Sequence, residues 1–480
     1  MRERKTCYDV AAAFIRRQME YQKQLPKRPV AAPAPEETLE RLRRRGIPRT
    51  GRAVEDVVRE LCEDVLPYGN HNDHPRFFGF IPGPASPLSW LGDVMTAAYN
   101  RHAGSVANQP AVWCVEQELI RWLNDRAGFP AEAGGLFVSG GSMANLTAMT
   151  IARDSLLPEE DWSRGVAYVS GQTHSSVEKG LRIIGIGSRR VRCIPTDDRF
   201  RMDVGALRAA VEEDVRRGLK PFLVVATAVT TNTGSVDPLA AIRRLCDEQN
   251  LWMHVDGAFG ASALLSGKHR KELAGIEQAD SLSWDAHKWL FQTLGCGMVL
   301  VRDQKRMLES FSVHPEYLRD LERGGMLVNP WDLGVELTRP ARCVKLWLTL
   351  QVMGSNRIGG CIEHGIESAE WVEWRLRAER EIEIVCPAQL AIINFRYAPA
   401  ELSEVQRNAL NHAIAEKMLE DGYAGVFTTE LNGKTVLRMC TLHPDVTKAE
   451  LGETLMRLDR YYRQTMEELA PARRPLPAGA

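Results

Sequence analysis

Several polar side chains in the middle of the chain have types and spacing that could do covalent chemistry. The clearest group is the pair His287 and Lys288, within the stretch Ser281-Leu-Ser-Trp-Asp-Ala-His-Lys-Trp-Leu-Phe-Gln-Thr-Leu-Gly-Cys-Gly297. Its close neighbours in sequence are aromatic, namely Trp284, Trp289 and Phe291. A lysine among aromatic rings loses hydration, so its neutral amine becomes more available, and Schiff-base chemistry requires a neutral amine. The pair alone is weak evidence, since most His-Lys dipeptides are ordinary surface residues.

A turn of small residues, Ser139-Gly-Gly-Ser142, precedes a predicted helix that begins at Met143. Small residues let the backbone approach an anion, and the free N–H groups and dipole of a helix N-terminus favour negative charge. The turn could therefore hold a phosphate group, although a plain capped turn explains this motif equally well. It is not the Gly-x-Gly-x-x-Gly fingerprint, and Gly185-Ile-Gly187 follows a helix, so NAD binding is not favoured.

Two further polar residues follow predicted strands. His174, in Gln172-Thr-His-Ser-Ser-Val-Glu-Lys179, could stack on a ring or move a proton, although a single histidine of this kind is more often structural. Asp256 ends an apolar strand in His254-Val-Asp-Gly-Ala258, after the polar loop Thr230-Thr-Asn-Thr-Gly-Ser235. A carboxylate there is partly desolvated and needs a partner. That partner could be a protonated pyridine nitrogen, a nearby Arg or Lys side chain, or the backbone N–H groups of a turn that the aspartate caps.

Taken together, the four groups supply a phosphate seat, a stacking imidazole, a carboxylate for a ring nitrogen and a lysine amine. All four lie in loops after strands or at strand ends, which is the edge of an open α/β sheet where ligands bind. Each group is weak evidence alone, but the ordered set is the set that pyridoxal 5'-phosphate (PLP) requires. The sequence therefore predicts a PLP site, with no metal ion.

The elements that must position these residues alternate between strands and helices. The predicted strands are Leu136–Val138, Val166–Val169, Val191–Ile194, Phe222–Ala226, Trp252–Val255 and Met298–Val301. The predicted helices between them are Met143–Arg153, Ser176–Ile186, Asp203–Arg217 and Pro238–Gln249. Lys288 would lie in a connection that feeds a strand, after a short polar lead-in. This alternation is typical of an α/β domain with a mostly parallel sheet and helices on both faces.

Three units are predicted along the chain. Residues 1–105 form an N-terminal helical wrapping segment, 106–365 the large α/β domain and 366–480 a small C-terminal α+β domain with a hairpin turn at Asn432-Gly433.

Composition excludes several other classes. The 480 residues include 61 Lys+Arg and 62 Asp+Glu, so no basic excess indicates nucleic acid or an anionic membrane as a partner. No apolar run reaches the roughly 20 residues of a membrane span. The ten cysteines are scattered and do not form CxxC pairs, which favours reduced thiols in a cytoplasmic enzyme.

Three segments resemble the group II PLP-dependent amino-acid decarboxylases, that is, the aromatic-L-amino-acid decarboxylase family, and bacterial tryptophan decarboxylases most closely. They are Asp73-His-Pro-Arg-Phe-Phe-Gly-Phe-Ile-Pro-Gly-Pro-Ala-Ser86, Thr173-His-Ser-Ser-Val-Glu-Lys-Gly-Leu181 and Ser283-Trp-Asp-Ala-His-Lys-Trp-Leu-Phe-Gln-Thr293. The resemblance runs from about His71 to the C-terminal domain. It implies the PLP fold type I, a homodimer with shared active sites, and an N-terminal segment that wraps the partner.

The resemblance also implies a role for each matching residue. Lys288 would hold PLP as a Schiff base, His174 would stack on its ring, Asp256 would pair with the ring nitrogen and Ala258 would pack on the other face. Gly141, Ser142, Thr231 and His287 would bind the phosphate, and Thr338 would approach it from the partner subunit. His314-Pro-Glu-Tyr317-Leu matches the loop that carries the catalytic tyrosine, so Tyr317 is the expected proton donor to the substrate's α-carbon.

The predicted substrate pocket consists of Phe80, Ile81, Pro82, Gly83 and Trp331, residues that suit an aromatic side chain and could equally be core. No obvious arginine or lysine would hold a distal carboxylate, which argues against glutamate. The resemblance favours decarboxylation of tryptophan to tryptamine, with phenylalanine to phenethylamine as a second reaction. The alternatives are a decarboxylase of tyrosine, histidine or glutamate, another fold type I enzyme such as an aminotransferase or aldolase, and a non-catalytic PLP-binding protein.

Two residues depart from the family pattern. Many relatives have Asn where this chain has Asp285, and a carboxylate there would repel a phosphate unless it is paired or turned away. Val229 stands where a glycine is expected, before Thr230-Thr231, and could shift the loop that carries Thr231.

Overall fold

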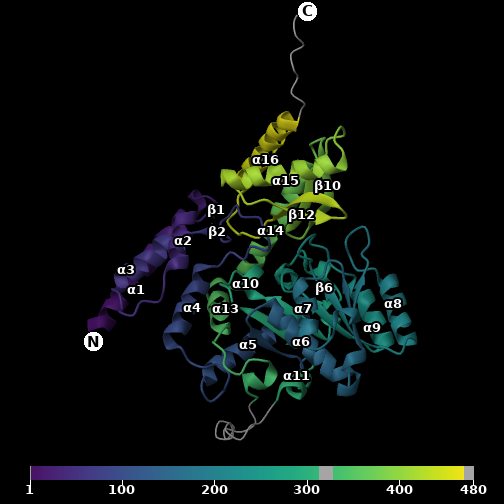
Figure 1. The fold of residues 1–480 in the computed structure, drawn as a ribbon. Coiled ribbons are helices and arrows are strands. Elements are labelled where there is room, and N and C mark those ends of the chain that lie inside the picture. The colour runs from purple at the N-terminus through teal and green to yellow at the C-terminus, as the bar shows by residue number, and fades with distance from the viewer. Residues whose placement is uncertain (1, 313–327, 470–480) are drawn as a thin grey trace, which may run out of the picture.

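The structure is a computed structural model that describes residues 2–312 and 328–469 of the 480-residue chain. A large α/β layer structure occupies one end of the molecule and a smaller sheet with two long helices the other, while helices from the N-terminus lie along one side (Figure 1). The expected large α/β domain and small C-terminal α+β domain are confirmed.

The large sheet has seven strands in the order β3-β9-β8-β7-β6-β4-β5. Their bounds are β3 Gly134–Val138, β4 Gly165–Ser170, β5 Val191–Ile194, β6 Lys220–Thr227, β7 Trp252–Asp256, β8 Ser281–Asp285 and β9 Gly297–Val301. Neighbours pair in parallel except on the two sides of β9, which runs antiparallel to both β3 and β8. The predicted mostly parallel sheet is therefore correct, and the carboxyl ends of six strands meet at one edge with the start of β9.

Helices cover both faces of this sheet, as the apolar character of its strands requires. One face packs on α6 (Gly141–Leu156), α7 (Ser175–Ile183) and α11 (Gln304–Phe311). The other face packs on α5 (Pro110–Ala127), α8 (Val204–Arg216), α9 (Leu239–Gln249), α13 (Cys343–Met353) and α14 (Ser355–Leu376). Asp203 caps α8 through its side chain, as predicted.

Strand β8 corrects the sequence prediction, which assigned a polar lead-in before Lys288. All five residues of Ser281–Asp285 are buried, although three of them are polar. The two serine hydroxyls are satisfied inside the sheet, because Ser281 Oγ bonds the Trp252 indole and Ser283 Oγ bonds Asp256. Polar residues can occupy a central strand when neighbouring strands supply their hydrogen bonds.

The C-terminal part forms a four-stranded antiparallel sheet in the order β10-β11-β13-β12. The strands are β10 Ile382–Gln389, β11 Ile392–Tyr397, β12 Phe427–Leu431 and β13 Lys434–Cys440, and they pack with α15 (Glu404–Asp421) and α16 (Lys448–Leu469). The predicted hairpin is confirmed, since Asn432 and Gly433 join β12 to β13 with positive φ angles of 51° and 77°.

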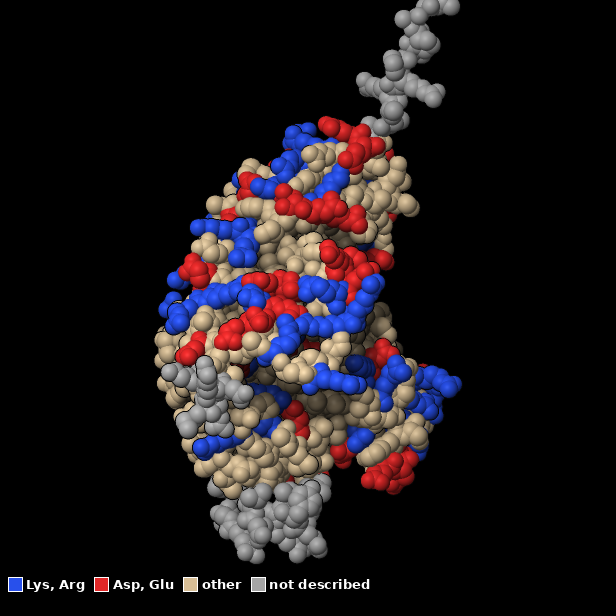
Figure 2. All heavy atoms as spheres, turned by 60° about the vertical axis from the view of Figure 1, so that its left-hand side comes forward, with Lys and Arg blue, Asp and Glu red and all other residues tan. Residues whose placement is uncertain are grey.

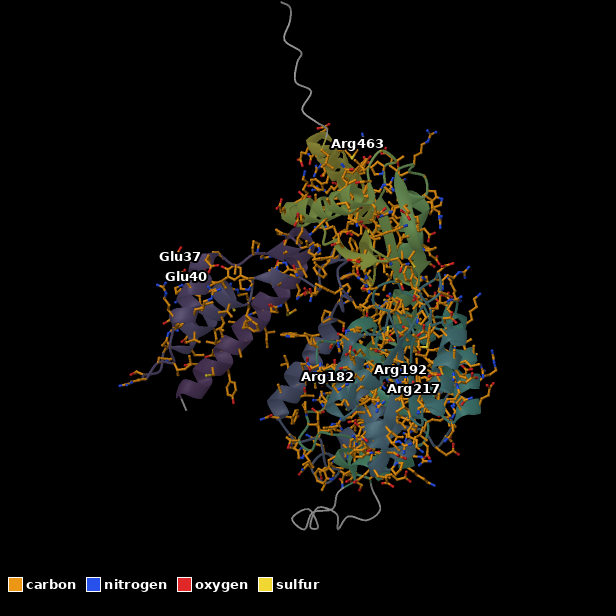
Figure 3. All side chains as sticks on the ribbon, turned by 45° about the vertical axis from the view of Figure 1, so that its right-hand side comes forward. Glu37, Glu40, Arg182, Arg192, Arg217 and Arg463 are labelled. Atoms are coloured by element: carbon orange, nitrogen blue, oxygen red, sulfur yellow. The ribbon has the colours of Figure 1, made fainter. Side chains whose placement is uncertain are left out.

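The N-terminal segment contains α1 (Arg2–Gln24), α2 (Glu36–Arg44), α3 (Val54–Glu60) and α4 (Pro87–Tyr99), with the short strands β1 (Ala31–Ala32) and β2 (Gly69–Asn70). Glu37 and Glu40 mark α2, which stands at the side of the molecule (Figure 3). His71 and His74 bond the backbone carbonyls of Pro29 and Arg28, so they anchor the proline-rich stretch.

Basic and acidic side chains are interspersed on the face that Figure 2 shows, without a broad area of one sign. No helix in the described part of the chain is both long and apolar enough to cross a lipid bilayer.

Candidate active site

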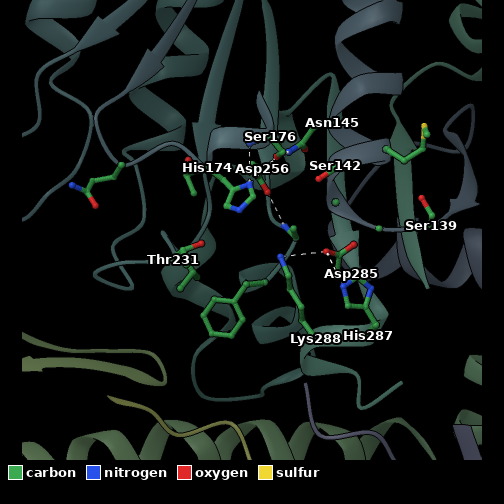
Figure 4. A pocket seen from close by; sticks show the side chains of 18 residues that line it. Ser139, Ser142, Asn145, His174, Ser176, Thr231, Asp256, Asp285, His287 and Lys288 are labelled. Atoms are coloured by element: carbon green, nitrogen blue, oxygen red, sulfur yellow. Dashed lines mark hydrogen bonds and ion pairs between the residues drawn. The ribbon is translucent and has the colours of Figure 1, made fainter. Parts of the chain in front are cut away.

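A cavity of about 440 Å³ opens at the carboxyl edge of the large sheet (Figure 4). Loops after β3, β4, β6, β7 and β8 all contribute to its wall, as expected for a ligand site in an α/β sheet. The lining residues are Ser139, Gly140, Gly141, Ser142, Met143, Asn145, Gln172, His174, Ser176, Thr227, Val229, Thr231, Asp256, Ala258, Phe259, Asp285, His287 and Lys288.

Lys288 lies on α10 (Ala286–Trp289), a single turn directly after β8. Its Nζ lies 3.3 Å from Oδ2 of Asp285, and His287 Nε2 lies 3.6 Å from the same oxygen (Figure 4). Trp284 and Trp289 are fully buried, and Trp289 stacks on Phe259. The nearest charged neighbour of the lysine is therefore a carboxylate, while the two tryptophans belong to the core.

The turn before α6 is crowded, which explains its glycines. A Cβ on Gly141 would lie 2.9 Å from Oδ2 of Asp285 and 3.0 Å from the methyl group of Ala258. Gly140 has φ 158° and is extended, and a Cβ there would lie 3.0 Å from His287 Cε1. The amino end of α6 thus faces His287 and Asp285 directly, with Ser142 beside it.

Asp256, at the end of β7, is buried and held by three donors. Asn145 Nδ2 donates to Oδ2 at 3.0 Å, while Ser283 Oγ and the Ala258 N–H each donate to Oδ1 at 3.1 Å. Burial alone raises the pKa of this carboxyl, but the attraction of Lys288 and His254 and the hydrogen bonds outweigh it, so the pKa is lowered. Asp256 is therefore an anion that can face a cation in the cavity.

A hydrogen-bond chain behind Asp256 has only one consistent arrangement of protons. The Asn145 amide must donate to the carboxylate, so its carbonyl oxygen accepts from His254 Nε2 at 3.0 Å. His254 Nδ1 then accepts from Ser281 Oγ at 2.9 Å. Burial lowers the pKa of His254 to about 4, so the ring is neutral at pH 7.

The same amide also reaches the predicted stacking histidine. Asn145 Nδ2 donates to Ser176 Oγ at 3.2 Å, and Ser176 Oγ lies 2.8 Å from His174 Nδ1. The backbone N–H of Ser176 also donates to His174 Nδ1, so this nitrogen is an acceptor and Nε2 carries the proton. Asn145 thus connects His174 with Asp256.

Thr231 lies in a loop that begins in a strained conformation. Val229 has φ 74°, in the left-handed region that suits glycine, and a β-branched residue there costs roughly 1–3 kcal/mol. This explains why a glycine was expected at the position. The hydroxyls of Thr230, Thr233 and Ser235 form a buried triangle with sides of 2.7, 3.0 and 2.9 Å, which fixes the loop after the strained residue.

The C-terminal sheet holds this loop from outside the cavity. Arg438 of β13, which is 5% exposed, donates from Nε and Nη2 to the carbonyl of Thr231 at 2.9 and 2.6 Å. Its Nη1 donates to the carbonyl of Phe80 at 2.5 Å. Burial lowers the pKa of Arg438. One guanidinium therefore connects the Thr231 loop with the Phe80 segment.

The cavity brings together eight of the residues that the sequence predicts for the site. They are Gly141, Ser142, His174, Thr231, Asp256, Ala258, His287 and Lys288. Gly83 lies behind the lysine, where a Cβ would overlap the His287 carbonyl oxygen. Tyr317 lies outside the described residues.

The other predicted residues do not line this cavity within the described part of a single chain. Phe80 is 60% exposed, with φ 52°, and Ile81 and Pro82 follow it along the segment. Trp331 is buried at 6.0 Å from the ring of His102, and Thr338 is exposed.

Sequence reasoning missed Asn145, Ser176 and Arg438. Asn145 lies one helical turn after Gly141 and so faces the same side of α6 as the predicted phosphate seat, a spacing that could have indicated it. Nothing in the local sequence of Arg438 places it beside Thr231, because that contact joins two separate sheets.

The residues present fit PLP. The cavity has room for a small aromatic phosphate ester. The buried Asp256 carboxylate at one side could pair with a protonated ring nitrogen. The N-terminus of α6, with serine, threonine and histidine side chains near it, could hold a phosphate at the other side. A family model described as the pyridoxal-dependent decarboxylase conserved domain matches residues 35–398. The chain belongs to this family of decarboxylases. It is therefore a carboxy-lyase that uses PLP.

Relatives of this decarboxylase include an aromatic-L-amino-acid decarboxylase of Bacillus atrophaeus, 38% identical over 92% of each chain. Tryptophan decarboxylase 2 of Oryza sativa subsp. japonica is 29% identical over 83% of this chain and 82% of its own. The crystal structure of Oryza sativa TDC with PLP and tryptamine superposes with a TM-score of 0.90 at 27% identity, covering 96% of this chain and 98% of that one.

Proposed function

We propose that this decarboxylase acts on aromatic L-amino acids, with L-tryptophan as the preferred substrate and tryptamine and CO₂ as products. L-Phenylalanine would be a second substrate, giving phenethylamine. The observation that carries the proposal is the charge of the cavity wall. Among the described residues that line it, Lys288 is the single lysine and arginine is absent. A substrate with a distal carboxylate would find no cation there, which argues against glutamate.

Aromatic side chains at the start of the segment that leads to Gly83 support the same choice. Phe80 lies 5.3 Å from Phe427 and 6.2 Å from Phe77, ring centre to ring centre, at the start of the segment that reaches Gly83. Such rings bind an indole or phenyl group by stacking and apolar contact. Two relatives also support the proposed substrates: the aromatic-L-amino-acid decarboxylase of Bacillus atrophaeus and tryptophan decarboxylase 2 of rice.

The site residues would divide the work as follows. Lys288 would hold PLP covalently, and Gly141, Ser142, Thr231 and His287 would hold its phosphate. His174 and Ala258 would enclose the ring from its two faces, and Asp256 would keep the ring nitrogen protonated. When bound, PLP withdraws the electrons that remain at the α-carbon after CO₂ departs.

The chain itself must orient the substrate and manage protons. The α-carboxylate has to lie out of the ring plane in surroundings that favour neutral CO₂ over the anion. Tyr317 would then return a proton to the α-carbon. Tyr317→Phe should keep PLP but lose amine formation, and a variant that makes amine at the full rate would contradict this role.

A homodimer would complete the site. Large apolar side chains are exposed on α1, α4 and the segment near Thr338, namely Tyr8, Met19, Leu91, Met95, Tyr99, Val335 and Leu337. Large apolar side chains exposed to solvent are typical of a subunit interface. Residues 1–105 would wrap the partner around the 106–365 domain, with 366–480 as the outer domain, and Thr338 would reach the partner's phosphate. Light scattering in solution measures the oligomeric state.

A product profile tests the proposed reaction. The purified protein with PLP is incubated separately with tryptophan, phenylalanine, tyrosine, histidine, glutamate and 2,4-diaminobutyrate, while CO₂ and amines are measured. We expect the highest kcat/KM for tryptophan and the next for phenylalanine. Faster reaction with glutamate or histidine would reject the substrate assignment. Keto acids without CO₂ would indicate an aminotransferase, and bound PLP without turnover a non-catalytic protein.

A further inference from the structure

Asp285 places a buried carboxylate next to the proposed phosphate seat. The residue is 1% exposed, and Oδ1 has no hydrogen-bond partner among the described residues. Its other oxygen, Oδ2, pairs with Lys288 at 3.3 Å. A buried carboxylate with an unsatisfied oxygen is unfavourable, so its place in the site needs an explanation.

The carboxylate lies against the amino end of α6. A Cβ on Gly297 would overlap Oδ1, and a Cβ on Gly141 would lie 2.9 Å from Oδ2. Helix α6 runs for sixteen residues. Its first N–H groups are proposed to donate hydrogen bonds to the phosphate. A bound phosphate and Asp285 would therefore share one helix end.

The charges around Asp285 change when PLP binds. The groups that face it are Lys288 and His287 of α10, the Cys296 thiol before β9 and the uncharged amino end of α6, with Asp256 beyond Lys288. The Lys288 ammonium balances Asp285 before binding. Covalent attachment removes that ammonium, and the phosphate brings further negative charge. Two anions this close favour a proton on one of them.

We propose that Asp285 accepts a proton from the Lys288 ammonium when the lysine joins PLP, and that the resulting carboxylic acid donates a hydrogen bond to the phosphate. The inference rests on the proposed role of Lys288. In this step an N–H bond of the ammonium breaks and an O–H bond forms on Oδ2. The neutral amine adds to the aldehyde carbon, and the aldehyde oxygen leaves as water with the other two ammonium protons. Nothing is oxidised or reduced.

The proposal gives Asp285 two successive uses. As an anion it pairs with Lys288 and keeps the amine at the cavity wall, oriented toward the arriving aldehyde. As a neutral acid its O–H group donates a hydrogen bond to the phosphate. The hydrogen bond is possible because the carboxyl group already lies at the helix end where the phosphate binds.

Proton linkage tests this directly on PLP binding, without using turnover. The wild-type enzyme keeps the lysine proton at the site, whereas Asp285→Asn must release it to solvent. The ratio of the wild-type to the variant Kd for PLP should therefore rise about tenfold for each pH unit between pH 7.5 and 8.5. Calorimetry in two buffers with different ionisation enthalpies should count one proton fewer released by the wild type.

Pyridoxal, which lacks the phosphate, is the control ligand for PLP. With pyridoxal the two proteins should show the same pH slope, because no anion then favours the proton on Asp285. Asp203→Asn is the matched variant, since it changes a surface cap on α8 where asparagine caps equally well. If Asp285→Asn does not fold, wild-type Kd values for PLP and pyridoxal should still differ in slope by one proton.

Two results would overturn the proposal. One is an equal pH slope for wild type and Asp285→Asn with PLP. The other is the same slope difference with pyridoxal as with PLP. Either result in an enzyme that still makes tryptamine would reject the role of Asp285 alone and leave the proposed function intact.

Discussion

Asn145 joins Asp256 to His174: its amide donates to Asp256 Oδ2 at 3.0 Å and to Ser176 Oγ at 3.2 Å, and Ser176 Oγ lies 2.8 Å from His174 Nδ1. One amide of α6 thus orients both side chains that are proposed to contact the PLP ring. His254 fixes the orientation of that amide from behind, because its Nε2 can only donate to the Asn145 carbonyl.

Asn145→Ala should lower kcat by about 10- to 100-fold, because positioning partners of this kind typically have effects of that size. The carboxyl of Asp256 would lose one of its donors, and its pKa would rise. We expect the acid limb of the pH–kcat profile to move to higher pH while PLP remains bound. Thr150→Ala on the same helix is the control, because that hydroxyl donates to the Leu146 carbonyl of its own helix. Equal losses in the two variants would show that Asn145 acts through α6 stability.

Much of the fold followed from residue pattern. Apolar runs such as Phe222–Ala226, separated by amphipathic helices, predict the α/β layers, and Asn432-Gly433 predicts the C-terminal hairpin. Strand β8 was missed because its serines look like a loop until Trp252 and Asp256 are seen to satisfy them. The hydrophobic pattern of a segment predicts a buried strand only when the buried residues are apolar.

The site was predictable where it depends on positions directly after strands. Asp256 and His174 were predicted in this way, because the topology brings strand ends to one edge. Lys288 was predicted from the His287-Lys288 pair, since the strand before it was missed. The role of Asp285 could not be predicted from the sequence, because it depends on two contacts in the fold. These are the 3.3 Å contact with Lys288 and the position at the N-terminus of α6. The bonds of Arg438 were equally hidden, because they cross between the two sheets.

Gly83→Ala should abolish most activity. Its Cβ would overlap the carbonyl oxygen of His287 and lie 3.2 Å from the Cα of Lys288, so either the segment or the lysine must move. Misplacement of a reacting group by about 1 Å can cost roughly 100-fold in rate. We expect a loss of at least that size in kcat/KM, together with weaker PLP absorbance. Gly187→Ala is the control, because its Cβ would meet nothing within 4 Å.

Arg438→Met should weaken PLP binding and raise KM together. The substitution leaves the part-buried carbonyls of Thr231 and Phe80 without this donor, and each lost hydrogen bond costs about 1 kcal/mol. The two segments on either side of the cavity would then move independently. We expect the Kd for PLP and the KM for the amino acid each to rise by about tenfold or more. PLP titration measures the first and steady-state kinetics the second.

A control for Arg438 lies on the same strand. Lys434 pairs with Glu383 at 2.7 Å on the outside of the sheet, and Lys434→Gln should leave PLP affinity and KM within twofold of wild type. If Arg438→Met changed stability but neither constant, the guanidinium would serve the C-terminal sheet and not the cavity.

The fold should lose stability as the pH falls from 7 to 5. Burial lowers the pKa of His74 and of His254 to about 4, from an ordinary 6.5, so these two side chains bind up to two more protons in the unfolded chain than in the folded chain as the pH falls to 5. By linkage each histidine contributes stability that is present above pH 6.5 and is lost as the pH falls toward 4, roughly 2 kcal/mol each by pH 5. Asp237 acts in the opposite direction, because burial raises its pKa from 3.8 to about 6. Its protonation adds about 1 kcal/mol to the free energy of unfolding as the pH falls from 7 to 5. The urea concentration at the unfolding midpoint should therefore fall on acidification, and His74→Asn should reduce that fall. A midpoint that is constant between pH 7 and pH 5 would contradict the neutral, buried state of both histidines.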